Sequence, residues 1–242
     1  MKKNLSFLAV LIVVAFMPAV RGLHAQKSFE GTITWSMTMS MLGDDDAHPM
    51  IINVKGKKSE TEMEMGAMGS MKTYSNQETR KMYMCMAMGA TKMNYVTDID
   101  DPTLQKAAQK ATDSLDLKPT GKKETIAGHP AEEFLLTGIK AQGASVDLSI
   151  WAAADFPKDM QETFSNSMNN KPGQDPKQTK AFRKLADKGL VPVRVVMKKD
   201  GEVAMSMEFV KYEQKSIDDS VVTPPADVKF SPMPTRGGGG TN

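Results

Sequence analysis

The chain has 242 residues, enough for one domain with a large core, and a formal net charge of +2. Cys85 is the single cysteine, which excludes an intramolecular disulfide, so the folded state must be stabilised by packing. A charge so close to zero provides no field of one sign, and we expect no nucleic-acid partner.

Residues 1–25 have the pattern of a secretory signal. Lys2 and Lys3 precede the apolar run Leu5–Val20, and small residues up to Ala25 offer a cleavage point. The run has 16 residues and contains a proline, which is short for a membrane span of about 20. Cleavage would remove three cations and no acid, changing the net charge from +2 to −1. We expect a periplasmic or secreted protein with no transmembrane segment after cleavage.

Three strands are expected in the first part of the mature chain. FEGTITWSMTMSM, residues 29–41, alternates apolar and polar side chains, which is typical of a long strand with one buried face. GDDDAHP, residues 43–49, has the composition of a turn. Strands follow at 50–56 and 59–65, and alternation in the second predicts that its glutamates, Glu60 among them, face solvent.

Residues 81–89, KMYMCMAMG, form the most unusual predicted strand, and another follows at 91–97. Before them, Gly66 and Gly69 suggest a bulge or bend. Every second residue of the first strand is a methionine that points to one side, while Cys85 points to the other. These methionines are Met82, Met84, Met86 and Met88.

Apolar residues then recur at steps of three and four, and Pro102 suits a first helical turn, which predicts a helix over 101–115. A hairpin of strands 122–127 and 131–139 follows, joined by the turn AGHP. A further strand is expected at 145–152.

The last part of the chain begins with a helical pattern over 156–190, broken at NNKPGQDP. LVPVRVVMKKDGEVAMSMEFVKYEQ then predicts a hairpin across KKDG, with Val203, Met205, Met207 and Phe209 on one side. Residues 231–242 are of low complexity and are expected to be disordered.

Together these elements predict a mostly β (α+β) fold in a single domain, residues 26–230. About ten antiparallel strands with one apolar face need a cover, and few helical residues are available to provide it. The sheet must therefore curve strongly around them. The predicted architecture is a half-open barrel with helices covering the concave face.

Five segments along nearly the whole mature chain carry a family resemblance. They are FEGTITWSM (29–37), KKETIAGHPAEEFLL (122–136), IWAAADFP (150–157), KGLVPVRVVM (188–197) and SIDDSVVTPPADVKF (216–230). They resemble the bacterial periplasmic lipoprotein-carrier (LolA-like) superfamily, and within it a family of secreted domains of unknown function. Relatives often carry an aromatic residue and a cysteine in the central hairpin, where this chain has His129 and Ala131. The resemblance implies a helix-capped half-barrel whose cavity, in the carriers, holds acyl chains.

The methionines allow three interpretations. All but Met1 and Met17 of the 21 methionines lie after the expected signal, and most are on alternating strands. They can fill an ordinary core, since methionine adapts to irregular gaps. They can also line a pliable apolar pocket, as on promiscuous binding surfaces. Thioether pairs at i and i+2 can alternatively hold Cu(I).

We expect the second interpretation, a binding or carrier protein for an acyl chain or lipid. The alternatives are a periplasmic copper-binding protein with Met-x-Met motifs and a structural envelope domain with a filled core. Other envelope proteins are conceivable partners. The residues expected to line the apolar cavity are Trp35, Met37, Met39, Met63, Met65, Met82, Met84, Met86, Met88, Trp151, Met205 and Met207.

Catalytic signatures are missing from the sequence. No glycine pattern of a phosphate loop precedes a lysine and a helix, and no serine lies in a nucleophile elbow. His129 stands in a predicted turn without a neighbouring nucleophile. We therefore expect a protein that is not an enzyme, and we assign no catalytic residue, metal ligand or cofactor.

Overall fold

The computed structural model describes residues 29–40, 44–66, 69–99, 116–141, 144–169 and 184–233. The signal expected over 1–25 and the helix expected over 101–115 lie outside these residues. Within the described part of the chain, no helix is long and apolar enough to cross a membrane.

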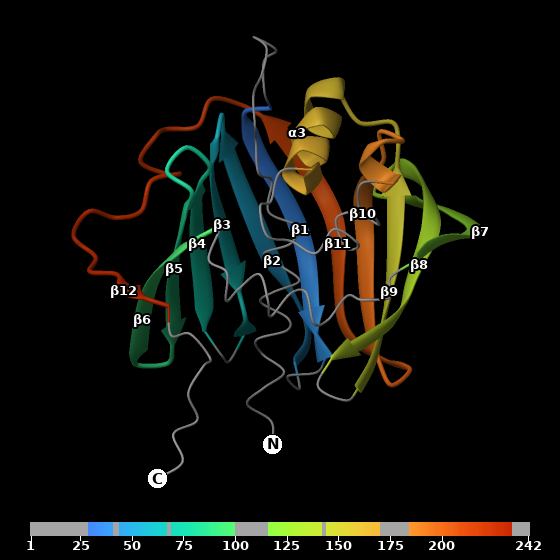
Figure 1. Ribbon diagram of the computed structural model, residues 1–242, viewed down its shortest axis with the longest axis horizontal. Helices are drawn as coiled ribbons and strands as arrows, with labels where there is room; N and C mark the ends of the chain where they lie inside the picture. Colours follow the sequence, from blue (N-terminus) through green and yellow to red (C-terminus); the bar gives the residue numbers. More distant parts are fainter. Residues whose placement is uncertain are drawn as a thin grey trace.

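Twelve strands form one sheet, and one helix of several turns is described with it (Figure 1). The strands of the first half are β1 (Gly31–Met39), β2 (Asp44–Lys55), β3 (Lys58–Glu64), β4 (Ser70–Asn76), β5 (Lys81–Met88) and β6 (Thr91–Asp98). Those of the second half are β7 (Asp116–Ile126), β8 (His129–Ala141), β9 (Ala144–Ala153), β10 (Val191–Lys199), β11 (Glu202–Gln214) and β12 (Ser231–Pro232). The helix α3 spans Lys158–Asn169.

The sheet consists of two meanders that meet in its middle. The strand order is β12-β6-β5-β4-β3-β2-β1-β11-β10-β9-β8-β7, so the pairing of β1 with β11 joins the two halves of the chain. Neighbours pair antiparallel except β12, which runs parallel to β6. The sheet curves, but its edge strands β7 and β12 are not paired with each other (Figure 1). A mostly β fold with a curved, open sheet was predicted and is confirmed.

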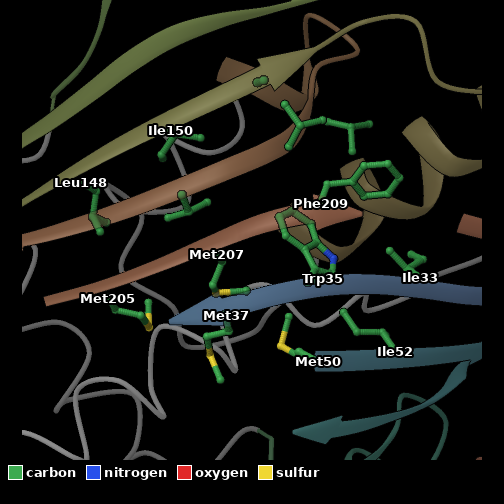
Figure 2. Packing of buried hydrophobic residues seen from close by; sticks show 14 of the residues in the cluster. Ile33, Trp35, Met37, Met50, Ile52, Leu148, Ile150, Met205, Met207 and Phe209 are labelled. Atoms are coloured by element: carbon green, nitrogen blue, oxygen red, sulfur yellow. The ribbon is translucent and has the colours of Figure 1, made fainter. Parts of the chain in front are cut away.

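The hydrophobic core lies on the concave face of the sheet. Successive residues of β1 alternate between buried and half-buried, which confirms the predicted inward face of this strand. Met37, Met205 and Met207 are fully buried there, and Met50 lies next to them (Figure 2). The central strands thus contribute sulfur-bearing side chains to one contiguous core.

Helix α3 is fixed to one end of the concave face by aromatic contacts. Phe156, just before the helix, meets Phe209 of β11 edge to face at a centroid distance of 5.3 Å. Met160 in the first turn of α3 is buried against the same cluster. This helix covers only one end of the sheet in Figure 1, so complete cover by helices stays a prediction.

Two hairpin turns agree with their sequence signatures. Ala127 and Gly128 have φ values of 50° and 86°, and Asp200 and Gly201 have 51° and 91°. Two consecutive residues of positive φ define the type I′ turn, whose twist matches that of the flanking strands. The hairpins predicted across AGHP and KKDG are therefore confirmed.

The acidic segment GDDDAHP is not the turn that its composition indicates. β2 begins at Asp44, and its backbone continues the ladder to β1, with Met37 opposite His48 and Met39 opposite Asp44. An irregularity between Met37 and Met39 lets the ladder accommodate this segment. The side chains of residues 45–47 are exposed, so the strand extends into solvent at no cost in buried charge.

Further differences from the prediction concern the strands β4 and β12 and the burial of two single residues. β4 was not predicted, since polar residues such as Thr73 and Ser75 occupy its buried positions. Glu60 was expected to face solvent but is only 3% exposed. Val203 was expected on the same buried side of its strand as Met205. It is exposed, because the pairing register of β10 and β11 shifts next to it. Ser231 and Pro232, inside the expected disordered tail, pair with β6.

Candidate functional site

The most distinctive feature of the concave face is a line of methionines that crosses five strands. β2, β3, β4, β5 and β6 each contribute one, and every member is the direct register partner of the next. Directly opposite residues have Cβ atoms about 4.5–5.5 Å apart. We call this line the methionine row; its members are Met50, Met63, Met71, Met86 and Met93.

The methionine row continues into aromatic residues at the centre of the sheet. Met50 is opposite Trp35 of β1, and Trp35 is opposite Phe209 of β11. The two rings meet edge to face at a centroid distance of 5.9 Å, and Figure 2 shows Met50 beside the indole. Trp35 therefore lies at the inner end of the row, where it can report on changes along it.

Burial decreases along the methionine row from the centre of the sheet to its edge. Met50, Met63 and Met71 are 1%, 2% and 1% exposed, whereas Met86 and Met93 are half-buried. A similar gradient runs along β5, from buried Met82 and Met84 to Met88, which is 44% exposed. The apolar surface is thus closed at its centre and accessible at the β5–β6 side.

Eleven of the twelve residues expected to line a cavity lie on the concave side. Met65 and Met86 among them are half-buried against the core, and Met88 is exposed at the end of β5. The others are buried: Trp35, Met37, Met39, Met63, Met82, Met84, Met205 and Met207. Alternation therefore placed these side chains correctly, while their contact with a ligand stays a prediction.

Trp151 is the residue that this expectation placed on the wrong face. Its neighbour Ile150 is fully buried in the core, so the pleat directs Trp151 to the convex side. There the Arg194 guanidinium lies 5.9 Å from its ring centroid. Trp151 lines a groove of about 380 Å³ on the convex face of β7–β10, together with Glu133, Ser149 and Lys198 among others.

The charged groups of this convex groove are mostly paired within the protein. Glu133 is 6% exposed and accepts hydrogen bonds from Ser149 Oγ at 2.6 Å and Thr120 Oγ1 at 2.9 Å. Lys122 Nζ lies 3.2 Å from the same carboxylate. Arg194 is held between Glu124 and Glu208 at 2.8 and 2.7 Å. These contacts tie β7, β8, β9, β10 and β11 together and fix the wall of the groove.

Two buried hydroxyls lie on the concave face. Alternation over residues 59–65 directs Thr61 inward, but its pairing with Thr73 was not predicted. Thr61 of β3 and Thr73 of β4 are each 1% exposed and directly opposite each other. Neither Oγ1 has a hydrogen-bond partner among the described residues. A buried polar group without a partner costs about 1–3 kcal/mol. The only sequence signal was an inward-facing position occupied by threonine where its neighbours are methionines.

Hard or borderline metal ligands do not converge in the part of the chain that the structure describes. No group of three or more His, Cys, Asp or Glu residues there could hold an ion. Cys85 lies opposite Lys72 on the convex side of β5, away from the methionine row, as alternation predicted. Burial raises the pKa of its thiol, an effect that the Lys72 charge partly opposes.

A family model described as a domain of unknown function (DUF4412) matches residues 29–228. The chain belongs to this family. The match extends from the start of β1 nearly to β12 and confirms the expected membership in a family of unknown function. No functionally curated protein matches the sequence. DUF4412 membership thus defines the domain without assigning it an activity.

Among solved structures, this DUF4412 domain is similar to MucB, with 11% identity and a TM-score of 0.42 over 92% of this chain and 64% of the other. The MucA/MucB complex of Pseudomonas aeruginosa gives 12% identity and a TM-score of 0.43, with 93% and 62% covered. A LolA superfamily protein of Nitrosomonas europaea gives 12% identity and a TM-score of 0.31, with 89% and 97% covered. The chain thus spans less than two thirds of the length of the MucB chains.

Proposed function

We propose that this DUF4412 domain binds an apolar chain, such as the acyl chain of a lipid, on the concave face of β1–β6 and acts as a binding or carrier protein of the bacterial envelope. The methionine row is the observation that supports this proposal. An acyl chain that follows the row, in place of the groups that now cover its buried members, would cross neighbouring strands and reach Trp35. Each buried methylene would contribute about 0.8 kcal/mol.

A row of methionines suits a variable occupant better than a fixed core. Thioether side chains are unbranched and flexible, so they adjust to different partners at low cost. The same property makes them poor at specifying one packed arrangement, which a purely structural core requires. The half-buried members Met86 and Met93 provide access from the β6 side, while Met50, Met63 and Met71 are shielded from water.

The two tryptophans allow a direct test because they lie on opposite faces. The variant Trp151→Phe keeps Trp35 at the end of the methionine row, and Trp35→Phe keeps Trp151 in the convex groove. A bromine atom quenches indole fluorescence only at close contact. Titration with methyl 9,10-dibromostearate should quench the Trp151→Phe variant, while methyl stearate should not.

The variant Trp35→Phe is the matched control for this experiment. Its remaining indole should keep its fluorescence during the same titration, because Trp151 lies on the convex face. Equal quenching of both variants would indicate non-specific adsorption and contradict the proposed site. Absence of quenching in both, with the fold intact by circular dichroism, would contradict acyl-chain binding itself.

A copper function is the second candidate, favoured by the direct adjacency of thioethers from neighbouring strands in the methionine row. Three soft sulfur ligands such as Met63, Met71 and Met86 suit Cu(I). Native mass spectrometry of the protein purified from its own envelope separates the candidates. Co-purified lipid supports the carrier proposal, stoichiometric copper supports the metal site, and an empty protein supports a structural domain.

A further inference from the structure

We infer that the apolar ligand carries a neutral carbonyl, as in an acyl ester, which accepts hydrogen bonds from Thr61 and Thr73 within the concave face. This inference rests on the proposed function and names the chemical class of its ligand. The carrying observation is the pair of opposed hydroxyls, each on a residue 1% exposed and without a partner among the described residues.

The surroundings of the threonine pair are apolar. Along the ladder, Thr61 is flanked by Ile52 of β2 and Thr73 by Met84 of β5. Two residues further along the strands, Met63 and Met71 of the methionine row stand opposite each other. That separation corresponds to about 6.4–6.8 Å along a strand. The row passes the threonine pair at its middle strands, β3 and β4, so an acyl chain that runs from there toward Trp35 would begin with its carbonyl beside the two hydroxyls.

Threonine is a poor choice for this position if packing is its only role. Valine has nearly the same shape and no hydroxyl, so it would fill the space without leaving a polar atom unpaired. Because Thr61 and Thr73 are directly opposite each other, their two hydroxyl donors lie side by side. A partner that supplies acceptors satisfies both, which a hydrocarbon chain alone cannot do.

The donor character of the pair selects among polar groups. Each hydroxyl can donate one hydrogen bond, and a carbonyl oxygen has two lone pairs to receive them. A carboxylate would bring a full charge into a setting formed by apolar register neighbours such as Ile52 and Met84, at a large desolvation cost. The neutral carbonyl of an ester carries no such cost, and so it is the group that the site fits.

The test compares two brominated ligands of equal chain length, 9,10-dibromostearate methyl ester and 9,10-dibromooctadecane, by quenching of Trp35 in the Trp151→Phe background. In that background, Thr61→Val and Thr73→Val should each weaken ester binding about tenfold and leave alkane binding unchanged. The ligand-free variants should unfold at the same temperature or higher, because an unpaired hydroxyl is removed. If the threonines served only the fold, their replacement should lower the unfolding temperature and leave ester binding unchanged.

Thr97→Val serves as the control, because Thr97 is also buried and its hydroxyl already donates to the Asp98 carbonyl at 3.4 Å. It should leave the ratio of ester to alkane affinity unchanged. If Thr61→Val and Thr73→Val weaken both ligands alike, or leave the ester unaffected, the carbonyl site is wrong while chain binding stands. If neither ligand quenches Trp35 in the starting protein, the proposed function falls and this inference with it.

Discussion

Glu60 and Glu133 are both buried on the convex face, yet their pKa values move in opposite directions. Burial raises the pKa of Glu60, and the single side-chain hydrogen bond, donated by Asn53 Nδ2 at 2.8 Å, only partly opposes it. Burial acts in the same sense on Glu133, but donors from Ser149, Thr120 and Lys122 together lower its pKa. The number of donors therefore decides which effect prevails.

Replacing Glu60 by Gln should stabilise the protein at neutral pH by about 1 kcal/mol. The amide oxygen of Gln can still accept from Asn53, and no charge is buried. Because the folded-state pKa lies above the ordinary 4.5, the cost of the ionised form is complete above the folded value and disappears as the pH falls to 4.5. Urea unfolding at pH 7 and pH 4 should show the gain only at pH 7.

The variant Ser149→Ala should act in the opposite sense, destabilising the fold at pH 7 by about 1–3 kcal/mol. The lowered pKa of Glu133 means that its ionised form stabilises the folded state above pH 4.5, and that this contribution is lost as the pH falls through the folded value. Urea unfolding at pH 7 and at pH 3 checks this. An equal loss at both values would show that Ser149 acts through packing and not through the carboxylate.

The centre of the methionine row should be far more sensitive to truncation than the end of β5. Met71→Ala removes a side chain that is 1% exposed and should cost about 2–5 kcal/mol of unfolding free energy. Met88→Ala, at 44% exposure, should change it by less than about 0.5 kcal/mol. Chemical denaturation measures both. Similar small losses would show that the row packs loosely along its whole length.

Gly69 is predicted to tolerate no side chain. A Cβ there would lie 1.8 Å from the Ala87 carbonyl oxygen of β5, and its φ is +110°. Gly128→Ala is the matched control, because its φ of +86° is also unfavourable but nothing lies within 4 Å. We expect a loss of about 1 kcal/mol for Gly128→Ala and a much larger one for Gly69→Ala, measured by thermal unfolding. Equal losses would indicate that β4 and β5 can separate locally.

Alternation of side chains predicted the face of each strand well where one face is apolar, as in β1 and β5. For Glu60 it gave the correct face but the wrong exposure, because the convex face also buries side chains that have a polar partner, here Asn53. Trp151 was expected in the cavity although alternation with the buried Ile150 directs it to the convex face, where Arg194 lies beside its ring. The methionine row could not be predicted from the sequence, because cross-strand register depends on turn lengths and bulges that composition does not specify.

The gradient of burial along β5 also sets the order in which its methionines are oxidised. Oxidants convert the methionine thioether to a polar sulfoxide, and they reach exposed sulfur first. Met88 would acquire oxygen before Met84, which is 4% exposed, and peptide mass spectrometry can follow the sequence of events. Early oxidation of Met88, at the end of β5, would leave the apolar interior unchanged, whereas oxidation of Met84 would make the concave face more polar.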